Sequence, residues 1–166
     1  MKKHKISTWL FASLMLTVVL LSACSRIKVG YLRTTGASFT PDTMFVYKKI
    51  DTESARYKNK APWVSTRIQG VAGTNPINYE YVSVEASNGG DATLFHQLAS
   101  KGRINVYGGL VQIHQDAVEQ LPNGNYTISI KVYNDEHSNL LSNVFTIVVA
   151  NEEVVNEPAI QNKKYI

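Results

Sequence analysis

The side chains best suited to acid–base or zinc chemistry in this chain are three histidines beyond residue 24. His96, His114 and His137 fall in different segments, and no spacing typical of zinc ligands links them. The sequence contains no G-x-S-x-G, H-E-x-x-H, phosphate-loop or C-x-x-C motif. We therefore expect a non-enzymatic protein without a metal or a cofactor. A hydrolase site assembled from His96, His114 and nearby carboxylates is the least favoured alternative.

Oxygen ligands occur together in the segment "YNDEHSN" (133–139). Asp135, Glu136 and Asn139 carry the hard oxygen atoms that calcium prefers. A solvated turn between two strands explains the same residues. We favour the turn and keep a calcium site as the alternative.

Four aromatic residues are the predicted ligand-binding residues: Trp63 in "KAPWV", and Tyr79, Tyr81 and Tyr133 on expected strands. If the valines of "YVSV" face the core, Tyr79 and Tyr81 point away from it, and Tyr133 does the same on its own strand. An exposed ring offers a large apolar area with a polar tip, which can stack on a sugar or anchor a partner protein. The alternative is packing between neighbouring strands.

Cys24 is the only cysteine, and it ends an apolar segment. The basic start "MKKHK" and the apolar stretch Trp9–Leu21 match a secretory signal. This stretch is shorter than the ~20 residues that span a bilayer as a helix. The sequence therefore predicts export, with an ordinary cleaved signal as the simplest form.

The residues "LLSAC" (20–24) resemble the lipobox of bacterial lipoproteins. This resemblance implies cleavage before Cys24, a diacylglycerol on its thiol and a fatty acid such as palmitate on the new amino terminus. Two or more acyl chains attach a protein firmly to a membrane, whereas one does so only marginally. We therefore expect Cys24 to be lipidated and the protein to be attached to the outer membrane of the cell envelope. Whether it faces the surface or the periplasm stays open.

The charge of the chain argues against nucleic acid as a partner. The sequence has 17 Lys and Arg against 13 Asp and Glu. Lys2, Lys3 and Lys5 belong to the predicted signal, which leaves 14 against 13. A nearly neutral body with scattered basic residues lacks the electrostatic footprint of a nucleic-acid-binding protein.

Short strands separated by turns account for most of the remaining chain. The clearest pattern is "LPNGNYTISIKVYND" (121–135), in which a turn precedes strict alternation of apolar and polar residues. Together with "LLSNVFTIVVA" (140–150) it predicts a hairpin. Asp91 can cap a helix that Gly102 ends. Further strands are expected at 27–33, 43–50, 63–71 and 79–86, with two around Gly108 and Gly109.

The segment from Leu121 through Gly124 and Tyr126 into the alternating strand resembles the immunoglobulin-like or cadherin-like modules of Bacteroidetes surface lipoproteins. This resemblance implies an all-β, antiparallel Ig-like β-sandwich with one short helix. In related glycan-uptake lipoproteins such modules serve as spacers or adjoin carbohydrate-binding domains.

The chain is thus expected to divide into four parts: a signal peptide (1–23), a lipidated terminus with a short tether (24–26), the Ig-like body (27–150) and a flexible tail (151–166) that could instead add an edge strand. The expected function is a lipid-anchored envelope module that binds a partner protein or a glycan. The alternative is a structural accessory subunit of an outer-membrane complex.

Overall fold

The computed structural model describes residues 30–152, and this part of the chain is mostly β-strand with short helices. The predicted signal peptide, Cys24 and residues 153–166 of the predicted tail lie outside the described residues. Within residues 30–152, no helix is both long and apolar enough to cross a membrane. The all-β class predicted from the sequence is confirmed for this part of the chain.

Nine strands and three helices occur between residues 30 and 152. The strands are β1 (Leu32–Arg33), β2 (Thr43–Tyr47), β3 (Trp63–Val64), β4 (Ala72–Gly73), β5 (Asn78–Ser87), β6 (Ile104–Tyr107), β7 (Leu110–Ile113), β8 (Gly124–Tyr133) and β9 (Ser138–Ala150). The helices are α2 (Ala55–Lys58), α3 (Ala92–Ser100) and α4 (Gln115–Gln120).

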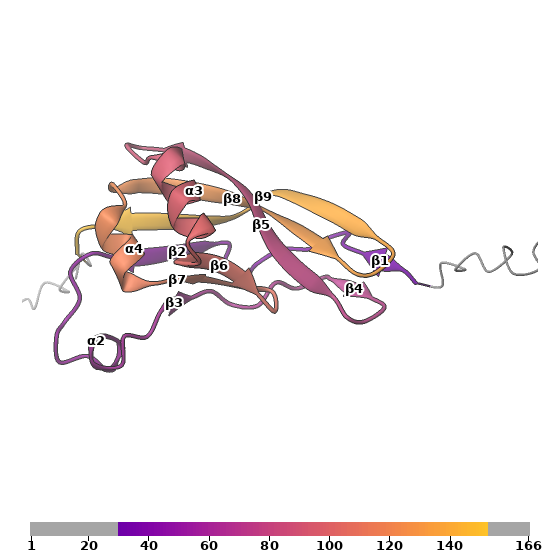
Figure 1. Ribbon diagram of the computed structural model, residues 1–166, viewed down its shortest axis with the longest axis horizontal. Coiled ribbons are helices and arrows are strands. Elements are labelled where there is room, and N and C mark those ends of the chain that lie inside the picture. Colours follow the sequence, from indigo (N-terminus) through magenta and orange to yellow (C-terminus); the bar gives the residue numbers. More distant parts are fainter. Residues whose placement is uncertain (1–29, 153–166) are drawn as a thin grey trace, which may run out of the picture.

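The strands form two main sheets and a two-stranded ribbon (Figure 1). The four-stranded sheet has the order β2-β9-β8-β5, the three-stranded sheet has the order β3-β7-β6, and β1 pairs with β4. The pairs are antiparallel except that β2 runs parallel to β9. The expectation of a wholly antiparallel arrangement is therefore wrong at this edge. A parallel pair needs a long connection, and here most of the described chain lies between the two strands.

The hydrophobic core joins both sheets and α3. Alternate residues of β8 and β9 point into it, among them Tyr126, Ile128, Phe145 and Ile147, all 1% exposed or less. The core also contains apolar side chains of the three-stranded sheet and of α3, namely Ile104, Val106, Val111, Ile113, Phe95 and Leu98. The predicted β8–β9 hairpin is confirmed, and its alternation explains why the two strands are central.

Helix α3 begins and ends where the sequence predicts. The Asp91 side chain accepts hydrogen bonds from the backbone N–H groups of Thr93 and Leu94 at 2.9 and 3.0 Å. Gly102 follows the helix with a φ of +71°, a left-handed conformation that glycine adopts without steric cost.

The prediction of a single helix is wrong. Helices α2 and α4 have four and six residues, too few to produce a helical period in the sequence. The predicted strands at 27–33 and 63–71 also shorten to β1 and β3 within the described residues. After β3 the chain is held by single backbone bonds, such as Ile68 N–H to the Gly109 carbonyl at 2.9 Å.

Tyr126 connects the start of β8 to the turn before α3. Its hydroxyl donates to the Pro122 carbonyl at 2.9 Å and accepts from the Asp91 N–H at 3.2 Å. Its ring stacks on Phe95 with centroids 5.2 Å apart. Nearby, a Cβ at Gly124 would lie 2.8 Å from the Ser87 carbonyl oxygen, so only glycine allows this close approach.

We expect Tyr126→Phe to lower the free energy of unfolding by about 1–3 kcal/mol, because it removes two part-buried hydrogen bonds worth about 0.5–1.5 kcal/mol each. Urea unfolding followed by circular dichroism measures the change. Tyr107→Phe is the matched control, since Tyr107 is 76% exposed, and it should alter stability by less than about 0.5 kcal/mol. Equal effects of the two substitutions would contradict the role of the Tyr126 hydroxyl.

Candidate functional site

A pocket of about 770 Å³ opens between α2 and α4. Its volume falls in the range of roughly 300–1,000 Å³ that is usual for small-ligand sites. Most of the residues around it carry polar or charged side chains: Ile50, Thr52, Arg56, Tyr57, Lys58, Lys60, Arg103, His114, Gln115, Asp116 and Glu119. We call this the α2–α4 pocket.

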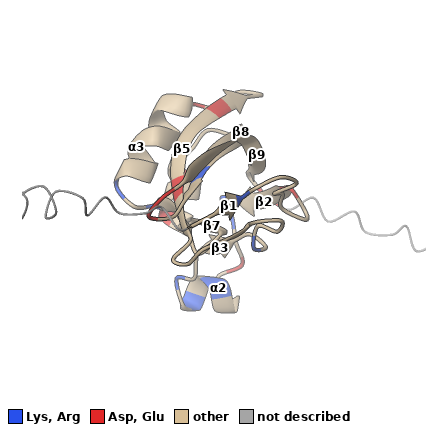
Figure 2. Ribbon diagram, turned by 90° about the vertical axis from the view of Figure 1, so that its right-hand side faces the viewer, with Lys and Arg blue, Asp and Glu red and all other residues tan. Residues whose placement is uncertain are grey.

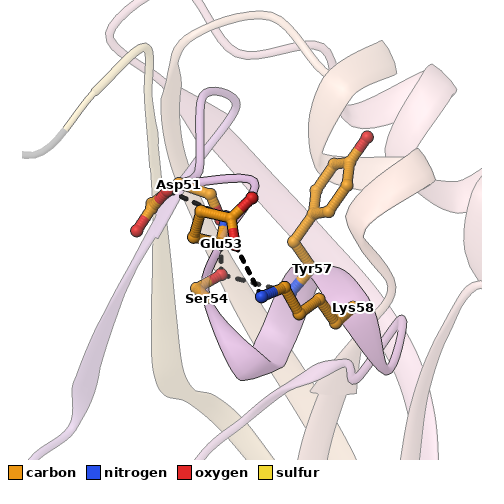
Figure 3. A network of polar contacts seen from close by, with 5 residues as sticks. All are labelled: Asp51, Glu53, Ser54, Tyr57 and Lys58. Atoms are coloured by element: carbon orange, nitrogen blue, oxygen red, sulfur yellow. Dashed lines mark hydrogen bonds and ion pairs between the residues drawn. The ribbon is translucent and has the colours of Figure 1, made fainter.

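Local hydrogen bonds order the α2 wall of the pocket (Figure 3). The Ser54 hydroxyl donates to the Asp51 carbonyl at 2.6 Å and accepts from the Tyr57 N–H at 3.2 Å. Lys58 Nζ lies 2.7 Å from a Glu53 carboxylate oxygen. The Tyr57 ring projects away from this network (Figure 3) and is part of the pocket lining, with the residue 51% exposed. The loop therefore presents an aromatic ring on an ordered support.

Trp63 supports the same wall through its contacts with Gln115 and Arg56. Its Nε1–H donates to Gln115 Oε1 at 2.8 Å, and the centre of the Arg56 guanidinium lies 4.1 Å from the centroid of the Trp63 ring. The Tyr47 ring packs edge-on against it at 5.8 Å between centroids. Trp63 is half-buried against the core, so it positions Arg56 and Gln115 beside the pocket.

The opposite wall comes from the start of α4 and the residue before β6. Arg103 and Asp116 form an ion pair at 2.9 Å, with both side chains about half exposed. His114 precedes α4 without forming a side-chain cap, and it also lines the pocket. The walls together offer hydrogen-bond donors and acceptors around one exposed aromatic ring.

Tyr79 and Tyr81 face the core, and the prediction that they point away from it is wrong. A register shift between Tyr81 and Ser83 marks a β-bulge in β5. The extra residue, Val82, is 40% exposed, and beyond it Val84 returns to the face that Tyr79 and Tyr81 occupy. The expectation assumed unbroken alternation, which a bulge interrupts.

These two tyrosines line a second, smaller pocket of about 340 Å³ between β5, α3 and β6. The Tyr81 hydroxyl lies 3.4 Å from His96 Nδ1. Within the described residues, Asn105 Oδ1 is a buried side-chain atom without a hydrogen-bond partner, and Asn105 lines the same pocket. Burial raises the pKa of both phenols above the ordinary value of 10.0, and the Arg67 guanidinium partly offsets this for Tyr79.

Tyr133 lies apart from the other three predicted binding residues. It is half-buried on β8, and Lys131 Nζ lies 4.8 Å from the centroid of its ring. Lys131 also pairs with Glu80 at 3.1 Å. The four aromatic residues thus occupy three separate places: Trp63 beside the α2–α4 pocket, Tyr79 and Tyr81 in the smaller pocket, and Tyr133 on β8.

The histidines and the acidic turn lie in different places in the fold. His96 is on α3, His114 precedes α4, and His137 is in the turn before β9, where its Nε2 lies 2.8 Å from the Gly30 carbonyl oxygen. Among residues 30–152, no group of three or more His, Cys, Asp and Glu side chains could hold a metal ion. Asn134 organises the turn instead, since its Oδ1 accepts from the N–H groups of Glu136 and His137.

Sequence reasoning missed most of the α2–α4 pocket. Its residues come from segments around 50–60, 103 and 114–119, which no sequence period connects. The one available signal was "ARYKNKAPW", in which basic residues and an aromatic residue precede Trp63. No family model, curated protein or solved structure matches this chain.

Because of the two tyrosines in the smaller pocket, we expect the free energy of unfolding to fall as pH rises above about 10. The unfolded chain releases phenolic protons at the ordinary pKa of 10.0, whereas the folded chain retains those of Tyr79 and Tyr81 to higher pH. High pH therefore favours the unfolded state. Below pH 10 the two phenols are protonated in both states, and their contribution to the free energy of unfolding is fully present.

Urea unfolding between about pH 8 and pH 11 measures this dependence. The double variant Tyr79→Phe/Tyr81→Phe should lose stability less steeply with rising pH than the unaltered chain. An equally steep fall in the double variant would show that these phenols do not cause it.

Proposed function

We propose that this chain is a lipid-anchored, non-enzymatic Ig-like module of the cell envelope that binds a glycan in its α2–α4 pocket. The observation that carries the proposal is that α2 and α4, the helices that line the pocket, lie at the end of the molecule opposite β1, the first strand of the described residues (Figure 1).

The strand order supports an Ig-like fold. In immunoglobulin constant-type domains, strands C, F and G share one sheet and strands B, E and D share the other. Here β5, β8 and β9 lie side by side in one sheet, and β3, β7 and β6 lie side by side in the other. Tyr126 near the start of β8 bonds back to the Pro122 carbonyl four residues upstream, as the tyrosine corner of such domains does.

The lipid anchor would attach at the Gly30 end. Cys24 precedes Gly30 by six residues, which span at most about 20 Å when extended. The β8–β9 turn contacts this end, because Asn134 Nδ2 donates to the Tyr31 carbonyl at 3.1 Å. From that turn, the 13 residues of β9 run to Ala150, which pairs with Tyr47 near the pocket. At about 3.3 Å per residue this is on the order of 40 Å.

The lining of the pocket favours a glycan over a protein partner. Protein-binding surfaces have an apolar centre that is depleted of charged residues. The α2–α4 pocket instead combines the Tyr57 ring with Thr, Gln, His and charged side chains. An accessory subunit of a membrane complex is the second candidate, and Phe45 on the edge strand β2, which is 55% exposed, favours it.

Replacing the lipidated residue tests the anchor. In a Gram-negative host that exports the full chain, the unaltered protein should be in the membrane fraction and take up labelled palmitate. Cys24→Ala should shift it to the soluble fraction, because the acyl chains that bury methylene groups are lost. Ser25→Ala is the control and should stay with the membrane. Retention of the Cys24→Ala protein in the membrane would contradict lipid anchoring.

A glycan array with the full chain in mild detergent tests the binding function. We expect retention on a subset of glycans, and a loss of roughly tenfold or more in affinity for Tyr57→Ala, because a stacking ring is removed. Tyr107→Ala removes an exposed ring on β6, away from the pocket lining, and should leave binding unchanged. The accessory role would replace the proposal if the chain bound no glycan but co-purified with a membrane complex, and if Phe45→Ser abolished that co-purification.

A further inference from the structure

We propose that the ligand of the α2–α4 pocket is an acidic saccharide, whose carboxylate is bound by Arg56 and Lys60 while a sugar ring lies against Tyr57. This inference rests on the proposed glycan-binding function and adds the charge class of the ligand.

Positive charge is concentrated around the pocket although the described body is not basic. Residues 30–152 contain ten Lys and Arg against eleven Asp and Glu. The pocket lining has the opposite balance, with four basic residues (Arg56, Lys58, Lys60 and Arg103) against Asp116 and Glu119. Figure 2 shows the blue of Lys and Arg on α2. A cleft lined by an excess of one sign of charge attracts ligands of the other sign.

Two of the four basic residues already have carboxylate partners. Lys58 pairs with Glu53 and Arg103 with Asp116. Within residues 30–152, the side chains of Arg56 and Lys60 form no ion pair with a carboxylate. These two cations are therefore the ones whose charge a bound anion would neutralise.

Arg56 is oriented before a ligand arrives. Its Nη1 donates to the Pro62 carbonyl at 2.6 Å, and its guanidinium lies over the Trp63 ring. A guanidinium has five N–H donors in one plane, and the bond to Pro62 uses one. Others remain to bind both oxygens of a carboxylate, the geometry in which arginine binds most strongly.

The neighbours of Arg56 argue for a saccharide as the carrier of that carboxylate. Tyr57 follows it directly and offers an exposed ring to an apolar sugar face. Lys60 follows with a φ of +49°, after the last turn of α2, and also lines the pocket. Glu119 and Thr52 supply carboxylate and hydroxyl groups that suit sugar hydroxyls.

Calorimetric titration of the full chain in mild detergent tests the inference, with trigalacturonic acid as the acidic probe and its methyl ester as the neutral one. We expect the acid to bind at least about tenfold more tightly than the ester, and less tightly as salt is raised. Arg56→Gln and Lys60→Gln should each weaken binding of the acid by about tenfold or more, because each loses a charged hydrogen bond.

Arg67→Gln is the matched control, since Arg67 is an exposed arginine outside the pocket lining, and it should leave binding unchanged. Lys60 is exposed, so its variant should fold even if Arg56→Gln does not. Equal binding of the acid and the ester would overturn the inference and leave glycan binding standing. Equal binding of a glutamate oligopeptide would overturn the choice of a saccharide. Binding of neither saccharide, together with an empty glycan array, would overturn both proposals.

Discussion

The side chain of Gln115 connects the parts of the molecule on which the pocket depends. Its amide nitrogen donates to the carbonyls of Tyr47 and Lys48 at the end of β2, at 3.1 and 2.9 Å. Its amide oxygen accepts from Trp63 at the start of β3. One half-buried amide thus joins the edges of both sheets to the beginning of α4. Trp63 in turn supports Arg56, so the α2 wall is fixed by contacts that begin at Gln115.

The long strands β8 and β9 separate the two ends of this body. Their turn contacts Gly30 and Tyr31. At its far end β9 pairs with β2, on the side of the molecule where α4 lies (Figure 1). The core between the sheets is apolar and contains no cysteine, so packing rather than a disulfide keeps the ends apart. If a lipid at Cys24 attached the protein to the membrane, the pocket would lie at the opposite end of the body. A receptor-like module needs its ligand site in that position.

Local patterns in the sequence predicted much of the fold. The alternation through Ile128 and Ile130, the cap at Asp91 and the turn before Tyr126 each depend on neighbouring residues, and each predicted its element correctly. The bulge at Val82 reversed the expected direction of two tyrosines, because one inserted residue changes the face of everything beyond it. The parallel pairing of β2 with β9 and the pocket itself join distant segments, and only tertiary packing brings those segments together.

The most direct test of this account is amide hydrogen exchange on the full chain with and without Gln115→Leu. The amide hydrogens of residues 58–61, at the end of α2 and in the turn after it, should exchange at least about tenfold faster in the Gln115→Leu protein. The reason is that the α2 wall of the pocket then loses its connection to β2. The amides of β8 should be unchanged. If residues 58–61 exchange at the same rate in both proteins, Gln115 does not hold the wall of the pocket, and the preformed site described above is wrong.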